Sequence, residues 1–124
     1  MDQIPLAVIG VNHPHLREWH SVLRLLPQVR PVAYYDADPD RARRLLEAPF
    51  DRLPVYGSVS ELLNRHAAQA AIVLLPLNEA EQALLTLAQA GLHIMAEKPV
   101  TRTAAALRAV KAVLTPQRAF YSGY

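Results

Sequence analysis

The chain has 124 residues, of which 52% are hydrophobic, so we expect one domain over residues 1–124 with one packed core. Its 13 basic and 11 acidic residues are scattered, which leaves no basic arm for nucleic acid and no basic patch for a membrane surface. The lack of cysteine excludes disulfides, thiolate catalysis and cysteine-ligated metals, and the lack of a signal-peptide pattern or a membrane-length apolar run predicts a cytoplasmic protein.

Short apolar runs alternate along the chain with segments of helical period, which is typical of a parallel sheet covered by helices. In chain order, we predict a strand at 4–10, a helix at 16–26, a strand at 29–35, a helix at 39–48, a strand at 53–56, a helix at 61–66, a strand at 70–75, a helix at 78–90, a strand at 92–96, a helix at 103–114 and a strand at 119–124. This alternation predicts an α/β fold in three layers, a Rossmann-type doubly wound parallel sheet of about six strands.

Three local signals mark helix ends. Asp38 followed by Pro39 predicts a helix start, with the aspartate as N-cap and the proline at the first helical position. Ser58 and Glu61 match a capping box. Gly91 suits the left-handed backbone position that often follows the last turn of a helix.

The turn after the first predicted strand is a candidate phosphate-binding loop, because backbone N–H groups and a helix dipole meet there. Residues 10–15 keep the first glycine of the G-x-G-x-x-G pattern, Gly10, and replace the others by Asn12 and His15. Asparagine is the milder change because it tolerates a positive φ, whereas His15 stands where glycine allows close helix packing. We expect Gly10, Asn12, His13 and His15 to line a pyrophosphate site; the alternative is an ordinary strand-to-helix turn.

Asp36 ends the second predicted strand, where an acidic side chain is placed to hydrogen-bond the ribose hydroxyls of a bound dinucleotide. Its charge also disfavours a 2′-phosphate, which predicts NAD rather than NADP as the cofactor. Nearby arginines, at positions 41, 43 and 44, soften that preference. The alternative interpretation is that Asp36 only caps a turn towards Asp38.

Three segments carry a resemblance to a known family. They are Val-Ile-Gly at 8–10, Tyr-Asp-Ala-Asp-Pro-Asp-Arg-Ala at 35–42, and Ala-Gly-Leu-His-Ile-Met-Ala-Glu-Lys-Pro-Val at 90–100. Together they resemble the N-terminal NAD(P)-binding domain of the glucose-fructose oxidoreductase/inositol dehydrogenase/MocA (Gfo/Idh/MocA) family, over essentially the whole chain. The Glu-Lys-Pro motif, preceded by Ala-Gly-x-His, is the most distinctive part.

The resemblance implies a catalytic role for Lys98, which would lie beside the nicotinamide and polarise the reacting substrate hydroxyl, with Glu97 next to it in the cofactor site. The alternative is a solvated lysine before a loop proline. The loop after the fourth predicted strand departs from the family's usual Thr-Pro-Asn, since it contains Leu75, Pro76 and Asn78, and Ala80 replaces a histidine. We still expect those first three residues to contact the cofactor.

A metal site is the other chemistry that the histidines suggest, above all His13, His15 and His20. Metal ligands must converge on one point with supporting partners, and no cysteine or acidic cluster accompanies these residues. We therefore expect no metal, and we interpret His66 and His93 as structural.

The resemblance also implies a second domain that forms the substrate pocket and builds the oligomer. The expected function is the NAD(P)-binding domain of an oxidoreductase that transfers hydride between a nicotinamide cofactor and a small hydroxylated substrate, such as a sugar or polyol. Substrate chemistry would then need a second domain or chain, and exposed apolar surface is expected near the sixth strand. The alternative is a noncatalytic binding or protein-association module. A phosphorylation-controlled receiver domain is excluded, because 11–13 and 56–58 lack its aspartates.

Overall fold

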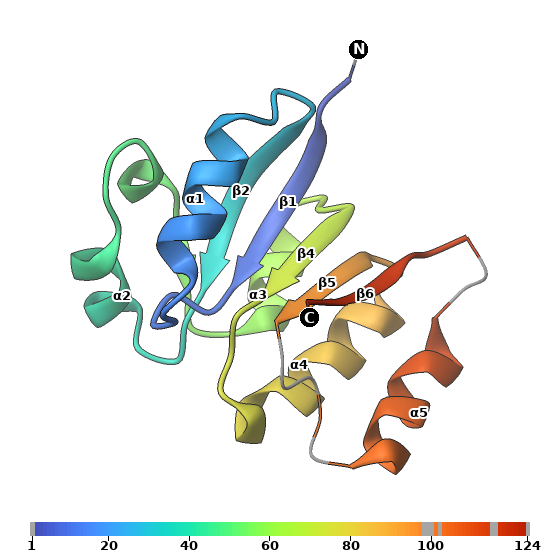
Figure 1. Cartoon of the computed structure of the whole chain (residues 1–124). Coiled ribbons are helices and arrows are strands. Elements are labelled where there is room, and N and C mark those ends of the chain that lie inside the picture. Colours follow the sequence, from blue (N-terminus) through green and yellow to red (C-terminus); the bar gives the residue numbers. More distant parts are fainter. Residues whose placement is uncertain (1, 98–100, 102, 115–116, 124) are drawn as a thin grey trace.

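Six parallel strands form one sheet in the computed structural model, which describes residues 2–97, 101, 103–114 and 117–123 (Figure 1). The strands are β1 (Ile4–Ile9), β2 (Val29–Tyr35), β3 (Val55–Tyr56), β4 (Ala70–Val73), β5 (His93–Glu97) and β6 (Phe120–Gly123). Their order across the sheet is β3-β2-β1-β4-β5-β6, and each neighbouring pair is parallel. The chain therefore builds outwards in one direction from β1 and then returns to build in the other.

Helices cover both faces of this sheet. They are α1 (Leu16–Arg24), α2 (Pro39–Leu45), α3 (Val59–Arg65), α4 (Leu77–Gln89) and α5 (Ala104–Val113), with a short 3₁₀ turn at Phe50–Arg52. Figure 1 shows α1 and α2 on one face and α3, α4 and α5 on the other. This arrangement confirms the predicted three-layer, doubly wound fold. None of the described helices combines the length and apolarity needed to cross a membrane.

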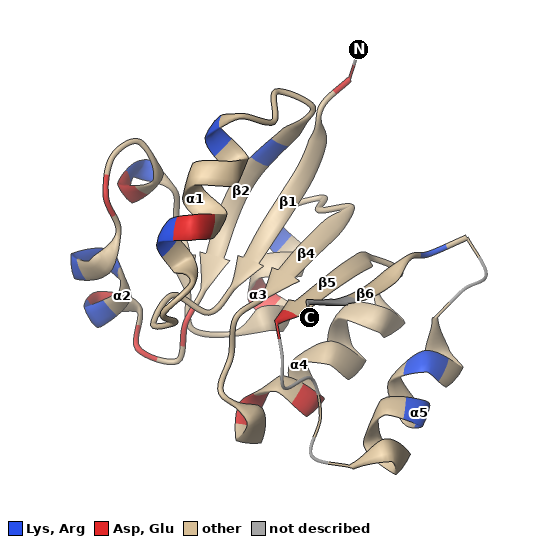
Figure 2. Cartoon of the chain, viewed as in Figure 1, with Lys and Arg blue, Asp and Glu red and all other residues tan. Residues whose placement is uncertain are grey.

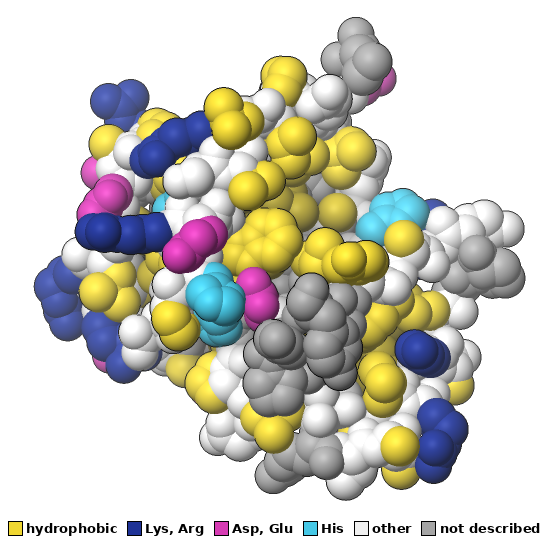
Figure 3. Space-filling view, in the orientation of Figure 1, with side chains coloured by type: hydrophobic (Ala, Val, Ile, Leu, Met, Phe, Trp, Pro, Cys, Tyr) yellow, Lys and Arg dark blue, Asp and Glu magenta, His cyan; other side chains and the backbone are white. Residues whose placement is uncertain are grey.

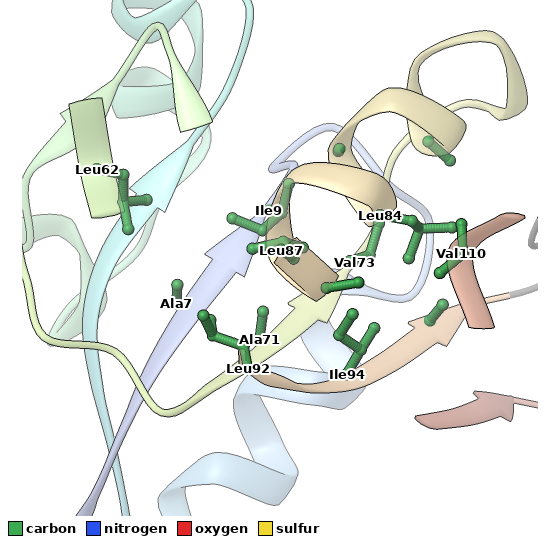
Figure 4. Close-up of a cluster of buried hydrophobic side chains, with 14 of the residues drawn as sticks. Ala7, Ile9, Leu62, Ala71, Val73, Leu84, Leu87, Leu92, Ile94 and Val110 are labelled. Atoms are coloured by element: carbon green, nitrogen blue, oxygen red, sulfur yellow. The ribbon is translucent and has the colours of Figure 1, made fainter. Parts of the chain in front are cut away.

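The central strand β1 is apolar on both sides because both of its faces are buried. Ala7 and Ile9 pack into the cluster beneath α3, α4 and α5, which also takes in Leu84 of α4 (Figure 4). Leu6 and Val8 point to the opposite face and pack with side chains of α1 and α2. Two separate cores therefore hold the sheet, and both depend on the two-residue alternation of the strands.

The predicted helix signals act as expected. The side chain of Asp38 accepts a hydrogen bond from the backbone N–H of Arg41, and Ser58 accepts one from that of Glu61. Gly91 follows α4 with φ +82°, in the left-handed region. Local chemistry thus sets these ends.

Several element ends differ from the predictions. The helix predicted at 39–48 ends at Leu45, because Leu46 turns to an extended backbone and is buried in the α1/α2 core. The strand predicted at 53–56 is reduced to two residues, and α1 ends at Arg24, two residues before the predicted end. The third and fourth helices begin before their predicted starts, at Val59 and Leu77. Burial of Leu46, which no local pattern reports, decides the end of α2, whereas the N-cap Ser58 places the start of α3 directly after it.

One part of the sheet is open on the α1 side. Figure 1 shows α1 and α2 over the β1–β3 half, and no described element lies over β5 and β6 on that face. There Met95 is half-buried, and Tyr121, its register partner on β6, is 59% exposed. Figure 3 shows apolar side chains gathered over α1 and the neighbouring strands. We call the surface made by Trp19, Val22, Met95 and Tyr121 the open face.

Candidate functional site

The carboxyl ends of β1, β2 and β4 meet at one edge of the sheet and enclose a small cleft of about 60 Å³. This edge lies at the point where the chain direction reverses, between β1 and β4, and doubly wound sheets bind ligands there. The cleft is lined by Gly10, Val11, Asn12, Asp36, Ala37, Arg41, Leu74, Leu75, Pro76 and Glu79. A larger groove of about 470 Å³ adjoins it and shares Leu75 and Glu79.

Gly10 is held in a backbone conformation that only glycine adopts easily. Its φ is +109°, and its N–H donates to the carbonyl oxygen of Tyr35, 2.8 Å away. A Cβ atom at Gly10 would lie 2.5 Å from the carbonyl oxygen of Leu74. The first glycine of the pattern is therefore required by the close approach of β1 to the chain after β4.

Asn12 lies at the lip of the cleft with an exposed side chain. Among the described residues, no residue other than glycine has a positive φ. The argument that asparagine replaces glycine here because it tolerates a positive φ is therefore wrong. The backbone at this position follows an ordinary path, and an asparagine side chain needs no special tolerance to occupy it.

Asp36 is the only acidic residue found buried among the described residues, with 5% of its surface exposed. One carboxylate oxygen accepts from the N–H of Val11 at 3.2 Å, and the other accepts from the N–H of Asp38 at 2.9 Å. The second oxygen also lies 3.5 Å from the guanidinium of Arg41. Asp36 thus caps the turn to Asp38, as the alternative interpretation predicts, and it also lines the cleft.

The loop between β4 and α4 forms the opposite wall. Leu75 and Pro76 line the cleft, whereas Asn78 is exposed and is not among the lining residues. Glu79, in the first turn of α4, lines both the cleft and the adjoining groove. Burial, together with the charges of Glu79 and Asp36, raises the pKa of Tyr35. Glu79 was not predicted as a site residue, because no motif in the sequence marks it.

A second group of polar side chains lies beside the cleft, where α1 begins. His15 is the N-cap residue of α1, and its Nδ1 lies 3.3 Å from Oε1 of Glu97 at the end of β5. The indole N–H of Trp19 donates to the same oxygen at 2.9 Å. Nδ1 of His13 accepts from the backbone N–H of His15. These residues do not line the cleft, so the structure separates His13, His15 and Glu97 from Gly10 and Asp36.

Hydrogen bonds and charge together set the ionisation of this second group. Burial acts to raise the pKa of Glu97, but the hydrogen bonds from Trp19 and His15 and the charges of His15 and His13 outweigh it and hold that pKa below its usual value. Burial lowers the pKa of His13, with Glu97 opposing the shift. Glu97 is therefore a carboxylate at neutral pH. Figure 2 shows acidic residues at the end of β2, at the start of α4 and at the end of β5.

The remaining histidines lie elsewhere. His20 is buried, with Nε2 2.7 Å from the hydroxyl of Tyr34 and its ring stacked on Phe50. His66 lies 2.8 Å from the hydroxyl of Tyr56, and His93 accepts from the N–H of residue 119. In the described part of the chain, no three His, Cys, Asp or Glu side chains are arranged to hold a metal. Lys98, predicted to be catalytic, lies outside the described residues.

Sequence comparison decides the family. The family model for Gfo/Idh/MocA proteins, described as an oxidoreductase family with an NAD-binding Rossmann fold, matches residues 4–123. The chain belongs to the Gfo/Idh/MocA oxidoreductase family. The resemblance noted from the sequence is therefore confirmed, and the chain is a Rossmann domain of the NAD-binding type. No curated protein matches the chain.

Solved structures similar to this Gfo/Idh/MocA domain include three with informative names. Myo-inositol 2-dehydrogenase from Lactobacillus plantarum is 20% identical, with a TM-score of 0.81 over 98% of this chain and 36% of that one. GenD2 from gentamicin A biosynthesis, in complex with NAD, is 20% identical, with a TM-score of 0.85 over 99% and 35%. A mutant of KijD10, a 3-ketoreductase from Actinomadura kijaniata, in complex with TDP-benzene and NADP, is 29% identical, with a TM-score of 0.77 over 90% and 35%.

The chain spans about a third of the length of the first structures it matches, since it covers 33% and 36% of them. Within that third, the residues present fit a dinucleotide. Gly10 allows the chain after β1 to pass close to the backbone of Leu74 and keeps the floor of the cleft free of a side chain, and the cleft adjoins a groove large enough for further atoms of a ligand. The two replaced glycines do not close this space, because Asn12 is exposed at its lip and His15 turns towards Glu97.

Proposed function

We propose that the chain binds NAD across the cleft, as the cofactor-binding part of an oxidoreductase that transfers hydride between the nicotinamide and a small hydroxylated substrate, such as a sugar or polyol. The observation that carries the proposal is the placement of Asp36. Its buried carboxylate lies at the end of β2 and lines the same cleft as Gly10. The carboxylate oxygen that accepts from Val11 has a second acceptor position that a ribose hydroxyl can use.

The preference for NAD over NADP follows from the charges at this cleft. Asp36 and Glu79 are two carboxylates in its wall, and both repel a 2′-phosphate. Arg41, which lies beside Asp36, offers the opposite charge and moderates the preference. We infer that NAD binds more tightly and that NADP binding is weaker without being abolished.

The other predicted residues take roles by their position at this edge. Gly10 and Asn12 would hold the pyrophosphate, with His13 and His15 beside it, and Leu75, Pro76 and Asn78 would contact the cofactor from the β4 side. Glu97 and Lys98 would lie at the reacting centre, where the lysine polarises the substrate alcohol as the family resemblance implies. The nicotinamide, when bound, supplies the hydride acceptor.

Substrate chemistry requires surfaces that this chain does not provide. Hydride transfer needs cofactor and substrate held together in a closed site. We infer that a second domain or chain completes the site, that it packs against the open face, and that the oligomer is built through that added part. The exposure of Tyr121 and Val22 supports this inference.

The test is a titration of the purified chain with NAD⁺, NADH and NADP⁺, followed by calorimetry and by the fluorescence of Trp19, its single tryptophan. We expect saturable binding of NAD⁺ and NADH, weakened about tenfold or more by Asp36→Asn, because a charged hydrogen-bond acceptor is lost. Asp40→Asn is the matched control, since it removes an exposed charge on α2 outside the cleft. Folding of each variant is checked by circular dichroism.

Two results would contradict the proposal. A folded chain that binds none of the three nucleotides would favour the noncatalytic association module instead. Equal effects of Asp36→Asn and Asp40→Asn would remove Asp36 from the ribose site, because only the general charge would then matter.

A further inference from the structure

The carboxylate of Glu97 joins two elements that are distant in sequence. It accepts from the Trp19 indole and lies within contact of the His15 imidazole, so that one oxygen on β5 is bound by two side chains of the first turns of α1. The His15 contact spans 82 positions of the chain. We call these three side chains the α1–β5 tie.

The tie is partly shielded from water. The side chain of Glu97 is 13% exposed and that of His15 is 53% exposed. The indole of Trp19, together with Val22 and Glu18, lines a hollow of about 330 Å³ with both of them. Figure 3 shows histidine and carboxylate side chains at the margin of the apolar surface over α1. Water therefore screens the contact on the His15 side only.

The other charges around the tie are few among the described residues. His13 faces it from the loop before α1, and Glu18 faces it from α1 itself. Arg17 points away, to Glu47, at 3.5 Å. The ionic partner of His15 is therefore Glu97, with Glu18 and His13 as the weaker neighbours of opposite and like charge.

We propose that Glu97 is a positioning residue of the cofactor site, which fixes the start of α1 against the end of β5 through His15 and Trp19. The inference deepens the proposed function and rests on it. His15 occupies the third glycine position of the loop, so its side chain links the loop to β5 where a glycine would leave them unlinked. The α1–β5 tie thereby fixes the distance between the start of α1 and the end of β5, at the edge of the sheet where the dinucleotide binds.

Trp19 reports the tie directly, without any cofactor. We expect Glu97→Ala to shift its emission, because the indole loses the acceptor that it shares with His15. Glu97→Gln keeps an acceptor and should restore most of the emission of the unsubstituted chain. His66→Gln is the matched control and should leave the emission unchanged, because His66 pairs with Tyr56 at a distant edge strand. An emission that is the same in Glu97→Ala and in the unsubstituted chain would overturn the proposal.

Cofactor affinity gives the second measurement. We expect Glu97→Ala to weaken NADH binding about three- to tenfold, because the start of α1 loses its hydrogen bond to β5. Glu97→Gln keeps an acceptor for the indole and should restore most of that loss. If Glu97 acted on the cofactor through its charge and without any tie, Glu97→Gln would not restore binding, and the proposal would be wrong.

The two measurements separate this proposal from the proposed function. A chain that binds NADH equally well with and without Glu97→Ala would contradict the positioning role alone. A chain whose Trp19 emission responds to Glu97→Ala but which binds no nucleotide would contradict the proposed function, and the positioning role with it.

Discussion

Two features require glycine at position 10: its positive φ, and the backbone of Leu74, which lies too close for a Cβ atom. The loss of stability that each feature would cause in a substituted chain can be measured separately. Gly10→Ala should lower the free energy of unfolding by at least about 2 kcal/mol, because a left-handed alanine is strained and its Cβ meets the backbone after β4. Gly91 also has a positive φ, but a Cβ there meets nothing within 4 Å. Gly91→Ala should therefore cost only about 1 kcal/mol. Urea unfolding of both variants tests this, and equal losses would show that the Leu74 contact is unimportant.

His20 gives the stability of the chain a dependence on pH. Burial, aided by the charge of Arg24, lowers the pKa of His20 below its ordinary value of 6.5. The unfolded chain therefore takes up a proton at a pH where the folded chain does not. The contribution of His20 is fully present above pH 6.5 and is lost as the pH falls below it, by up to about 1.4 kcal/mol per pH unit.

Unfolding in urea at several pH values between about 5 and 8 measures this loss. His20→Gln should flatten the profile, although it also removes the stacking on Phe50 and lowers the stability at neutral pH. His66→Gln, which changes a half-buried histidine, should keep the slope. A slope that persists in His20→Gln would assign the dependence to another group.

Single residues differ in how far the sequence identifies them. Gly10 and Asp36 are recognisable because their positions after β1 and β2 follow from the strand pattern. Glu79 is not recognisable in the same way, because its place in the cleft depends on the angle at which α4 leaves Pro76. The tie of His15 to Glu97 depends on the packing of α1 over the sheet, and no local pattern contains it.

At the scale of elements, α3 is a helix of seven residues that depends on its N-cap. Ser58→Ala should lower the free energy of unfolding by about 1 kcal/mol, because the N–H of Glu61 loses its acceptor. Ser60→Ala changes the same residue type at an exposed position two residues later and should have little effect. Thermal unfolding compares the two, and equal midpoints would show that the cap contributes nothing.

Helix starts are predicted better than helix ends in this chain, for a physical reason. A start is set by a side chain within three residues, as at Asp38 and Ser58. The end of α2 is set by the burial of Leu46 and Phe50 between the helix and the sheet, which is a tertiary effect. The number and type of the elements were therefore predictable, whereas the carboxyl ends of α1 and α2 were not.

At the scale of the whole molecule, the open face is an apolar surface that no described helix covers. Val22 is 42% exposed on this face, and Val113 is 38% exposed on α5, on the other side of the sheet. Val22→Ser should reduce the fluorescence of a bound apolar dye, such as anilinonaphthalene sulfonate, more than Val113→Ser does, because only Val22 belongs to a contiguous apolar surface. Neither substitution should change the free energy of unfolding by more than about 0.5 kcal/mol. Equal dye signals would show that the open face is not a contiguous binding surface.

The central position of β1 has a consequence for the order in which the chain folds during synthesis. β1 is made first, but it lies between β2 and β4, and its second neighbour ends at Val73. One edge of this apolar strand therefore stays without a partner until β4, about 60 residues later in the sequence, has left the ribosome. Pairing across such a distance is slow, and an unpaired apolar edge is a target for aggregation. The nascent chain therefore needs protection from aggregation at β1, the strand that ends directly before Gly10.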